Sequence, residues 1–173
     1  MSKFLVIAEK PSVAQSYAKN LSAYKREDGY LEGESCIVSW CLGHLAEYAQ
    51  PEEYDPKYEK WQFDDLPILP EVWKLKVSKD KKKQFEVIKT LMSRSDVEYL
   101  VNGCDAGREG ELIFQRVYDL AGCRKPVKRL WISSMEDAAI QKGFQTMKSE
   151  EEYKNLCMLS LIHISEPTRR TPI

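Results

Sequence analysis

Three acidic side chains lie at positions in the sequence where they could take part in phosphoryl transfer. Glu9 follows directly on the apolar run at residues 4–8, and Asp105 and Glu109 belong to a glycine- and acid-rich turn at residues 103–111. Mg²⁺ prefers carboxylate oxygens and keeps several of its waters. Because Asp105 and Glu109 are four residues apart across a predicted strand-to-helix turn, they can place both carboxylates on one side of an ion. Glu9 can supply a third ligand.

Two cations accompany these carboxylates. Lys10 is next to Glu9, and Arg108 precedes Glu109. Such cations suit a phosphate or the pentavalent transition state of phosphoryl transfer. By spacing alone the alternative is a solvated acidic turn, since 31% of the residues are charged.

Apolar periodicity predicts the elements that must position these groups. A buried strand at 4–8 leads through Pro11 into a helix that begins with a Ser12–Gln15 capping box. The other expected elements are a hairpin at 29–40, an irregular aromatic-rich excursion at 50–73, a helix at 84–92, a strand at 99–101, a helix that carries Ile113, Val117 and Leu120 and is capped by Gly122, a strand at 130–132, and a helix that carries Ile140, Phe144 and Met147.

Strand and helix alternate at least three times, which predicts an α/β fold with a mostly parallel sheet. Ligands of such sheets bind beyond the carboxyl ends of the strands. Both acidic loops lie at such ends, so we expect the carboxylates of Glu9, Asp105 and Glu109 to converge on one point.

The overall composition narrows the class of protein. The chain has 173 residues, is 43% hydrophobic and carries a net charge of −1. Basic runs at 74–83 and 124–129 are either solvated faces or contacts to DNA phosphates. Five cysteines without a CxxC pair argue against zinc and indicate reduced thiols in a cytoplasm. The apolar run at 4–8 is too short for a signal peptide or a membrane span.

Several segments in collinear order carry a family resemblance. Residues 3–12 (KFLVIAEKPS) and 105–114 (DAGREGELIF) resemble the two signature motifs of the Toprim domain in bacterial type IA DNA topoisomerases. Supporting matches to the topoisomerase III branch lie at 39–45, at Trp61 with 66–68, at 84–88, and at 129–134. The resemblance implies a Toprim, Rossmann-like fold with helices flanking the sheet and an irregular, β-containing insertion.

The resemblance also implies roles for individual residues. Glu9 would help to bind Mg²⁺ and assist proton transfer to the leaving 3′ oxygen, and Lys10 would stabilise the transition-state phosphate. Asp105 and Glu109 match the first and last acids of an Asp-x-Asp-x-Glu metal motif. Gly107 occupies the middle position and has no ligand atom, so the number of ions, one or two, stays open.

Other residues have two interpretations each. His44 would approach DNA or the acidic site, or else be a hydrogen-bonded structural histidine. Trp61 would contact single-stranded DNA, or else pin the irregular excursion. Glu111 would compensate for the missing acid, although a solvated or helix-capping role is the simpler interpretation. Trp131 is expected in the core.

The resemblance implies Mg²⁺-dependent, ATP-independent breakage of a single DNA strand, strand passage and rejoining. The partner would be single-stranded DNA, with no membrane and no nucleotide cofactor. The nucleophilic tyrosine is expected in a later domain, so these residues alone should not cleave DNA. The alternatives are another Toprim enzyme, such as a primase or nuclease, and a non-catalytic DNA-binding module.

Three domain ranges follow. Residues 1–128 would form the Toprim domain, with its insertion at about 29–80, and 129–157 would begin the next helical domain. Residues 158–173 resemble translated sequencing-adapter sequence and are expected to be non-native; a divergent genuine tail is the alternative.

Overall fold

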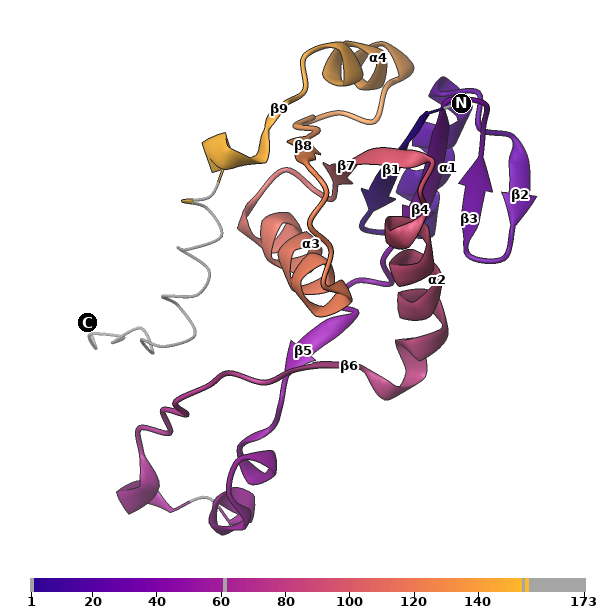
Figure 1. Cartoon of the computed structure of the whole chain (residues 1–173). Coiled ribbons are helices and arrows are strands. Elements are labelled where there is room, and N and C mark those ends of the chain that lie inside the picture. The colour runs from indigo at the N-terminus through magenta and orange to yellow at the C-terminus, as the bar shows by residue number, and fades with distance from the viewer. Residues whose placement is uncertain (1, 61, 154, 156–173) are drawn as a thin grey trace, which may run out of the picture.

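A seven-stranded sheet in the order β2-β3-β4-β1-β7-β8-β9 organises the chain (Figure 1). This computed structural model describes residues 2–60, 62–153 and 155. The strands of the sheet are β1 (Lys3–Ala8), β2 (Lys25–Glu27), β3 (Tyr30–Glu32), β4 (Cys36–Trp40), β7 (Val97–Gly103), β8 (Val127–Arg129) and β9 (Lys148–Ser149). The pairings β4–β1, β1–β7 and β7–β8 are parallel, and those toward the two edges are antiparallel. The predicted α/β class with a mostly parallel sheet is confirmed.

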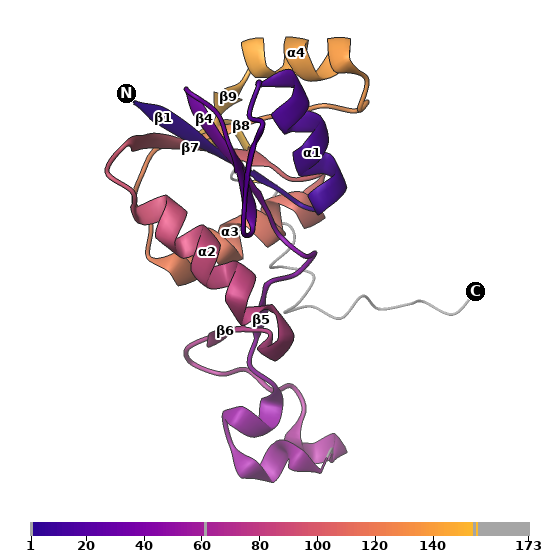
Figure 2. The same cartoon turned by 90° about the vertical axis from the view of Figure 1, so that its right-hand side faces the viewer.

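The central strand β1 is covered on both faces, which explains its unbroken apolar run. Leu5 and Ile7 pack with the apolar side chains of α2 and α3, whereas Val6 and Ala8 pack with those of α1 and α4. The helices are α1 (Pro11–Asn20), α2 (Lys82–Ser93), α3 (Arg108–Ala121) and α4 (Asp137–Gln145). Figure 2 shows α1 and α2 on opposite sides of the sheet. The core is therefore two apolar layers separated by the sheet.

The helix ends follow local chemistry, with one correction. Helix α1 begins at Pro11 with Lys10 as its N-cap, so the predicted Ser12–Gln15 capping box is not used. Proline is favoured at a first helical position because its missing N–H has no helical partner there. Gly122 caps α3 in the left-handed conformation, with φ at 66°, as predicted.

The irregular segment projects away from the sheet as a separate arm (Figure 1). Strands β5 (Ala46–Tyr48) and β6 (Leu75–Val77) form a two-stranded sheet at its base. The segment between them, residues 49–74, carries three short 3-10 turns at Pro51–Glu53, Pro56–Glu59 and Phe63–Asp65. Strands β3 and β4 belong to the main sheet, and the chain leaves that sheet after Trp40. The insertion at about 29–80 stays a prediction.

The strand predicted at 130–132 lies three residues earlier, as β8. Its partner β7 ends at Gly103, and the register pairs Asn102 with Arg129, so little of β7 is left to pair with later residues. Trp131 is consequently not in the core. Its side chain is 41% exposed and stacks on Tyr153, with ring centroids 5.1 Å apart.

Some sequence predictions concern residues that the structure does not describe. Trp61 and the segment 158–173 lie outside the described residues. The predicted domain boundaries at 128 and 157 stay predictions, although β8, β9 and α4 join the same sheet and helix layers as the residues before them. Across residues 2–60, 62–153 and 155, no helix has both the length and the apolar character needed to cross a bilayer.

Candidate active site

The site lies where β1 and β7 end side by side. Ala8 and Gly103 are partners at the last step of this parallel pair, and each chain then turns into an acidic loop. The backbone N–H of Asp105 donates to the Glu9 carboxylate, at 3.4 Å from Oε2. Two residues that are 96 positions apart in the sequence are thereby brought into direct contact.

Lys10 lies between these two carboxylates. Its Nζ is 3.8 Å from Glu9 Oε1 and 3.7 Å from Asp105 Oδ2. The Glu9 side chain is 13% exposed, whereas those of Lys10 and Asp105 are about half exposed. A negatively charged ligand can therefore reach the ammonium from solvent, with the two carboxylates at its sides.

Glu109 is directed toward a different neighbour. It lies in the first turn of α3, and its Oε2 is 3.4 Å from Nε2 of His44. The loop that carries His44 touches the site as well, because the N–H of Gly43 donates to the Glu9 carbonyl at 3.3 Å. His44 is exposed and lies beside Glu109 of the acidic loop, and both interpretations of its role stay predictions.

The structure thus brings together Glu9, Lys10 and Asp105, with Glu109 and His44 as a neighbouring pair. Among the residues described, no three histidine, cysteine or acidic side chains are arranged to hold a metal ion. The donor set still suits Mg²⁺, because this ion is commonly held by one or two carboxylates together with waters and a substrate phosphate. Glu9 and Asp105 would be those two carboxylates.

A buried polar network supports the loop from below. Arg129 is 0% exposed, and its Nε donates to Glu111, which is 2% exposed. Asn102 donates to the other oxygen of Glu111 at 3.2 Å. Nη2 of Arg129 reaches the carbonyl of Asp105 at 2.8 Å. The network links the end of β7, the start of α3 and the end of β8.

Sequence reasoning missed this network. The basic run at 124–129 predicts a solvated or DNA-binding Arg129, and the simpler of the two interpretations of Glu111 is a solvated or helix-capping residue. Both predictions are wrong, because both side chains are buried. A signal was available, because Glu111 stands three residues before Phe114 and therefore shares its helix face. Phe114 is fully buried, so a carboxylate on that face requires a buried cation.

Further buried groups surround the loop. The Tyr17 hydroxyl donates to the Gly103 carbonyl at 3.0 Å, and burial raises the pKa of Tyr17. Glu150 accepts from Asn102 at 3.4 Å, and burial together with the nearby Glu111 carboxylate raises the pKa of Glu150 to about 7. The neighbouring Cys41 thiol and burial raise the pKa of Cys104. Tyr17 and Cys104 are therefore held in their neutral forms beneath the charged surface of the site, whereas Glu150 exchanges its proton near neutral pH.

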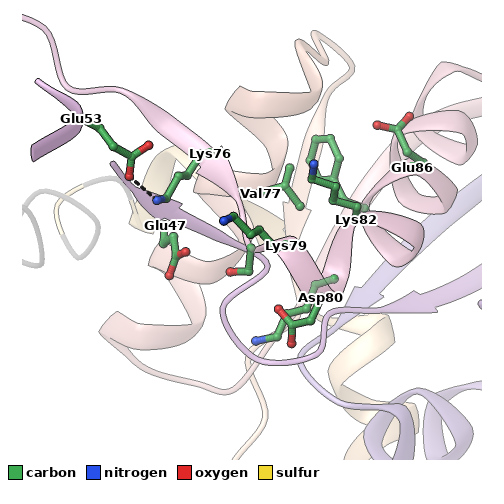
Figure 3. A pocket seen from close by; sticks show the side chains of 11 residues that line it. Glu47, Glu53, Lys76, Val77, Lys79, Asp80, Lys82 and Glu86 are labelled. Carbon is green, nitrogen blue, oxygen red and sulfur yellow. Dashed lines mark hydrogen bonds and ion pairs between the residues drawn. The ribbon is translucent and has the colours of Figure 1, made fainter. Parts of the chain in front are cut away.

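A cavity of about 930 Å³ lies elsewhere, between β6 and the start of α2 (Figure 3). Its charged lining is balanced: the cations are Lys76, Lys79, Lys81 and Lys82, and the anions are Glu47, Glu53, Asp80 and Glu86. Lys76 pairs with Glu53, and Lys81 donates to the His44 carbonyl at 3.1 Å. This balance favours the solvated-face interpretation of the basic run at 74–83.

Comparison with known proteins places this geometry in a family. The Toprim domain matches residues 4–135. Over 156 residues, 90% of this chain, the chain is 50% identical to DNA topoisomerase 3 of Bacillus subtilis and 51% identical to DNA topoisomerase 3 of Bacillus cereus. It spans only about a fifth of the length of these relatives (22% and 21%).

A solved structure shares the fold. It is the full-length topoisomerase I from Thermotoga maritima, with a TM-score of 0.62 and 18% sequence identity, over 93% of this chain and 23% of that one. At this identity the likeness bears on the fold alone. The family match covers most of the chain and includes both acidic loops, and the chain therefore belongs to the Toprim domain family.

Proposed function

We propose that this chain is the Mg²⁺- and phosphate-binding part of a type IA DNA topoisomerase of the topoisomerase III kind. Such an enzyme breaks one DNA strand, passes another through the gap and rejoins the first, without a nucleotide cofactor. The observation that carries the proposal is the position of Lys10 between Glu9 and Asp105. The 50% identity to DNA topoisomerase 3 supports it.

The chemistry assigned to these residues follows from their positions. Mg²⁺, when bound, would supply positive charge that neutralises the reacting phosphate. Lys10 would turn from the carboxylates toward a phosphate oxygen and stabilise charge there. Glu9, the least exposed of the three, would assist the transfer of a proton to the leaving 3′ oxygen. Arg108, at the first position of α3, would add a second cation for the phosphate.

The attacking tyrosine must come from elsewhere in the whole enzyme. We assign it to a part of the relatives beyond the aligned 156 residues, so strand cleavage needs more than the segment described above. Single-stranded DNA would be the partner, with His44 beside the acidic site as one contact and Trp61 as another. A DNA substrate would place the enzyme in the bacterial cytoplasm.

A chimera tests the proposal. The matching 156 residues of the Bacillus subtilis enzyme would be replaced by those of this chain, and relaxation of negatively supercoiled plasmid would be measured with Mg²⁺ and without ATP. We expect relaxation by the chimera and none by its Glu9→Ala variant. The matched control Glu34→Ala, an exposed turn residue remote in sequence from both acidic loops, should remain active. A folded chimera without relaxation, or full activity of Glu9→Ala, would overturn the proposal.

Metal binding alone does not distinguish the candidate enzymes. A primase or nuclease with the same domain would also bind Mg²⁺ through two carboxylates. Relaxation by the chimera separates these classes, because only a topoisomerase changes the linking number of an intact circle.

A further inference from the structure

The guanidinium of Arg129 donates to four backbone carbonyls. Nη1 lies 3.0 Å from the Asn102 carbonyl, 2.8 Å from that of Cys104 and 2.9 Å from that of Leu130. Nη2 lies 2.8 Å from the carbonyl of Asp105. Three of these four carbonyls belong to the segment that carries the chain from β7 to the acidic site.

One peptide unit connects Arg129 to Glu9. The carbonyl of Cys104 and the N–H of Asp105 belong to the same peptide, and in a trans peptide they point in opposite directions. The carbonyl accepts from Arg129 at 2.8 Å, while the N–H donates to Glu9 at 3.4 Å. By binding the Cys104 carbonyl on one side of the peptide, Arg129 therefore directs the Asp105 N–H on the other side toward Glu9.

We infer that Arg129 is a positioning residue for the acidic site: by holding the carbonyls of Cys104 and Asp105, it keeps Asp105 facing Glu9 and Lys10. The consequence for metal binding rests on the proposed function. The orientation of the loop does not, and it can be measured without any metal.

Glu111 holds the side chain of Arg129 in place. Its carboxylate neutralises the buried guanidinium through Nε, and Asn102 donates to its second oxygen at 3.2 Å. The side chain of Arg129 is thereby held with its two terminal nitrogens free to contact the loop. A lysine could neutralise Glu111, but it lacks the planar fork of five donors that reaches separate carbonyls at once.

The test uses Arg129→Lys in the 173-residue chain. Amide hydrogen exchange would be followed by NMR below the unfolding transition, without metal, and Mg²⁺ affinity would be measured by calorimetry. We expect the amides of Cys104 and Asp105 to exchange at least tenfold faster, and the affinity for Mg²⁺ to fall at least tenfold. The amide of Cys41 is an internal control. It donates to Ala8 at 2.7 Å in the neighbouring loop, and it should be unchanged.

A double variant distinguishes loss of the positioning role from loss of folding. In Arg129→Met/Glu111→Leu both buried charges are removed, so no unpaired charge remains in the core. We expect this variant to fold and to show the same faster exchange at Cys104 and Asp105. A core variant on the other face of the sheet, Ile140→Val, should keep both the protected amides and the affinity, since Ile140 belongs to the apolar layer of α1 and α4 and Cys104 to the opposite one.

The outcomes separate the two proposals. Unchanged exchange at Cys104 and Asp105 in both Arg129 variants would overturn the positioning role. If the unmodified chain bound no Mg²⁺ while the variants still loosened the loop, the proposed function would fail and the role of Arg129 would stand.

Discussion

The Cα of Gly110 lies so close to the backbone of Asp105 that a Cβ at this position would be 2.0 Å from the Asp105 carbonyl oxygen. The same oxygen accepts from Arg129. The first turn of α3 therefore packs directly against the acidic loop, and glycine is needed here for space rather than for an unusual backbone angle.

Gly110→Ala should accordingly displace the loop. Overpacking of this kind costs on the order of 1–3 kcal/mol of unfolding free energy, because backbone must move to admit the methyl group. We expect that loss in urea unfolding of the chain, together with weaker Mg²⁺ binding. Gly107→Ala is the matched control: its φ of 166° is extended backbone, and nothing lies within 4 Å of the added Cβ. Equal stability of the two variants would contradict the packing argument.

Lys10→Ala should separate metal binding from phosphate binding. The ammonium lies 3.7 and 3.8 Å from the two carboxylates, so its removal makes the electrostatic potential around them more negative. In this half-exposed setting the effect is about 1 kcal/mol, or several-fold in affinity. We expect tighter Mg²⁺ binding by calorimetry and weaker binding of a single-stranded oligonucleotide. Lys89→Ala, an exposed lysine on α2, should change neither; a fall in Mg²⁺ affinity for Lys10→Ala would argue against the arrangement.

Glu150 should make stability depend on pH. Its pKa in the folded chain is about 7, raised from 4.5 by burial and by Glu111, so between these values the folded state holds a proton that the unfolded state has lost. This contribution is full below about pH 4.5 and is lost as the pH rises through 7. We expect the unfolding free energy to fall between pH 5 and pH 8 by on the order of 1–2 kcal/mol more than in Glu150→Gln.

Urea unfolding at both pH values measures the difference, and Glu86→Gln, at an exposed site, should behave like the unmodified chain. Parallel pH profiles for the unmodified chain and Glu150→Gln would refute the assignment.

Tyr17→Phe tests how much the hydrogen bond from Tyr17 to the end of β7 stabilises the fold. The hydroxyl donates to the Gly103 carbonyl at 3.0 Å in a buried setting, and burial raises its pKa so that it stays a neutral donor. Its removal leaves a buried carbonyl without this partner, which costs about 1–2 kcal/mol. Thermal unfolding should show the loss, whereas Tyr24→Phe should be neutral because that ring is 73% exposed. A neutral Tyr17→Phe would mean that the carbonyl finds another donor.

The local pattern of the sequence determined the elements and part of the site. The apolar runs at 4–8 and 99–101 predicted two buried strands, and parallel strands joined by helices end at the same edge of a sheet. That rule is enough to bring Glu9, Lys10 and Asp105 together, because each follows its strand within two residues. The left-handed cap at Gly122 was equally local and equally predictable.

Only the tertiary structure decided what each charged side chain faces. Glu109 and Glu111 are two residues apart on one helix, yet the first is 75% exposed beside His44 and the second is buried against Arg129. Spacing along the chain places Glu111 on the helix face of Phe114, but it does not identify the cation that Glu111 meets there. A buried carboxylate such as that of Glu111 needs a counter-charge, and here Arg129 at the end of β8 supplies it. The two residues meet only once the sheet has formed.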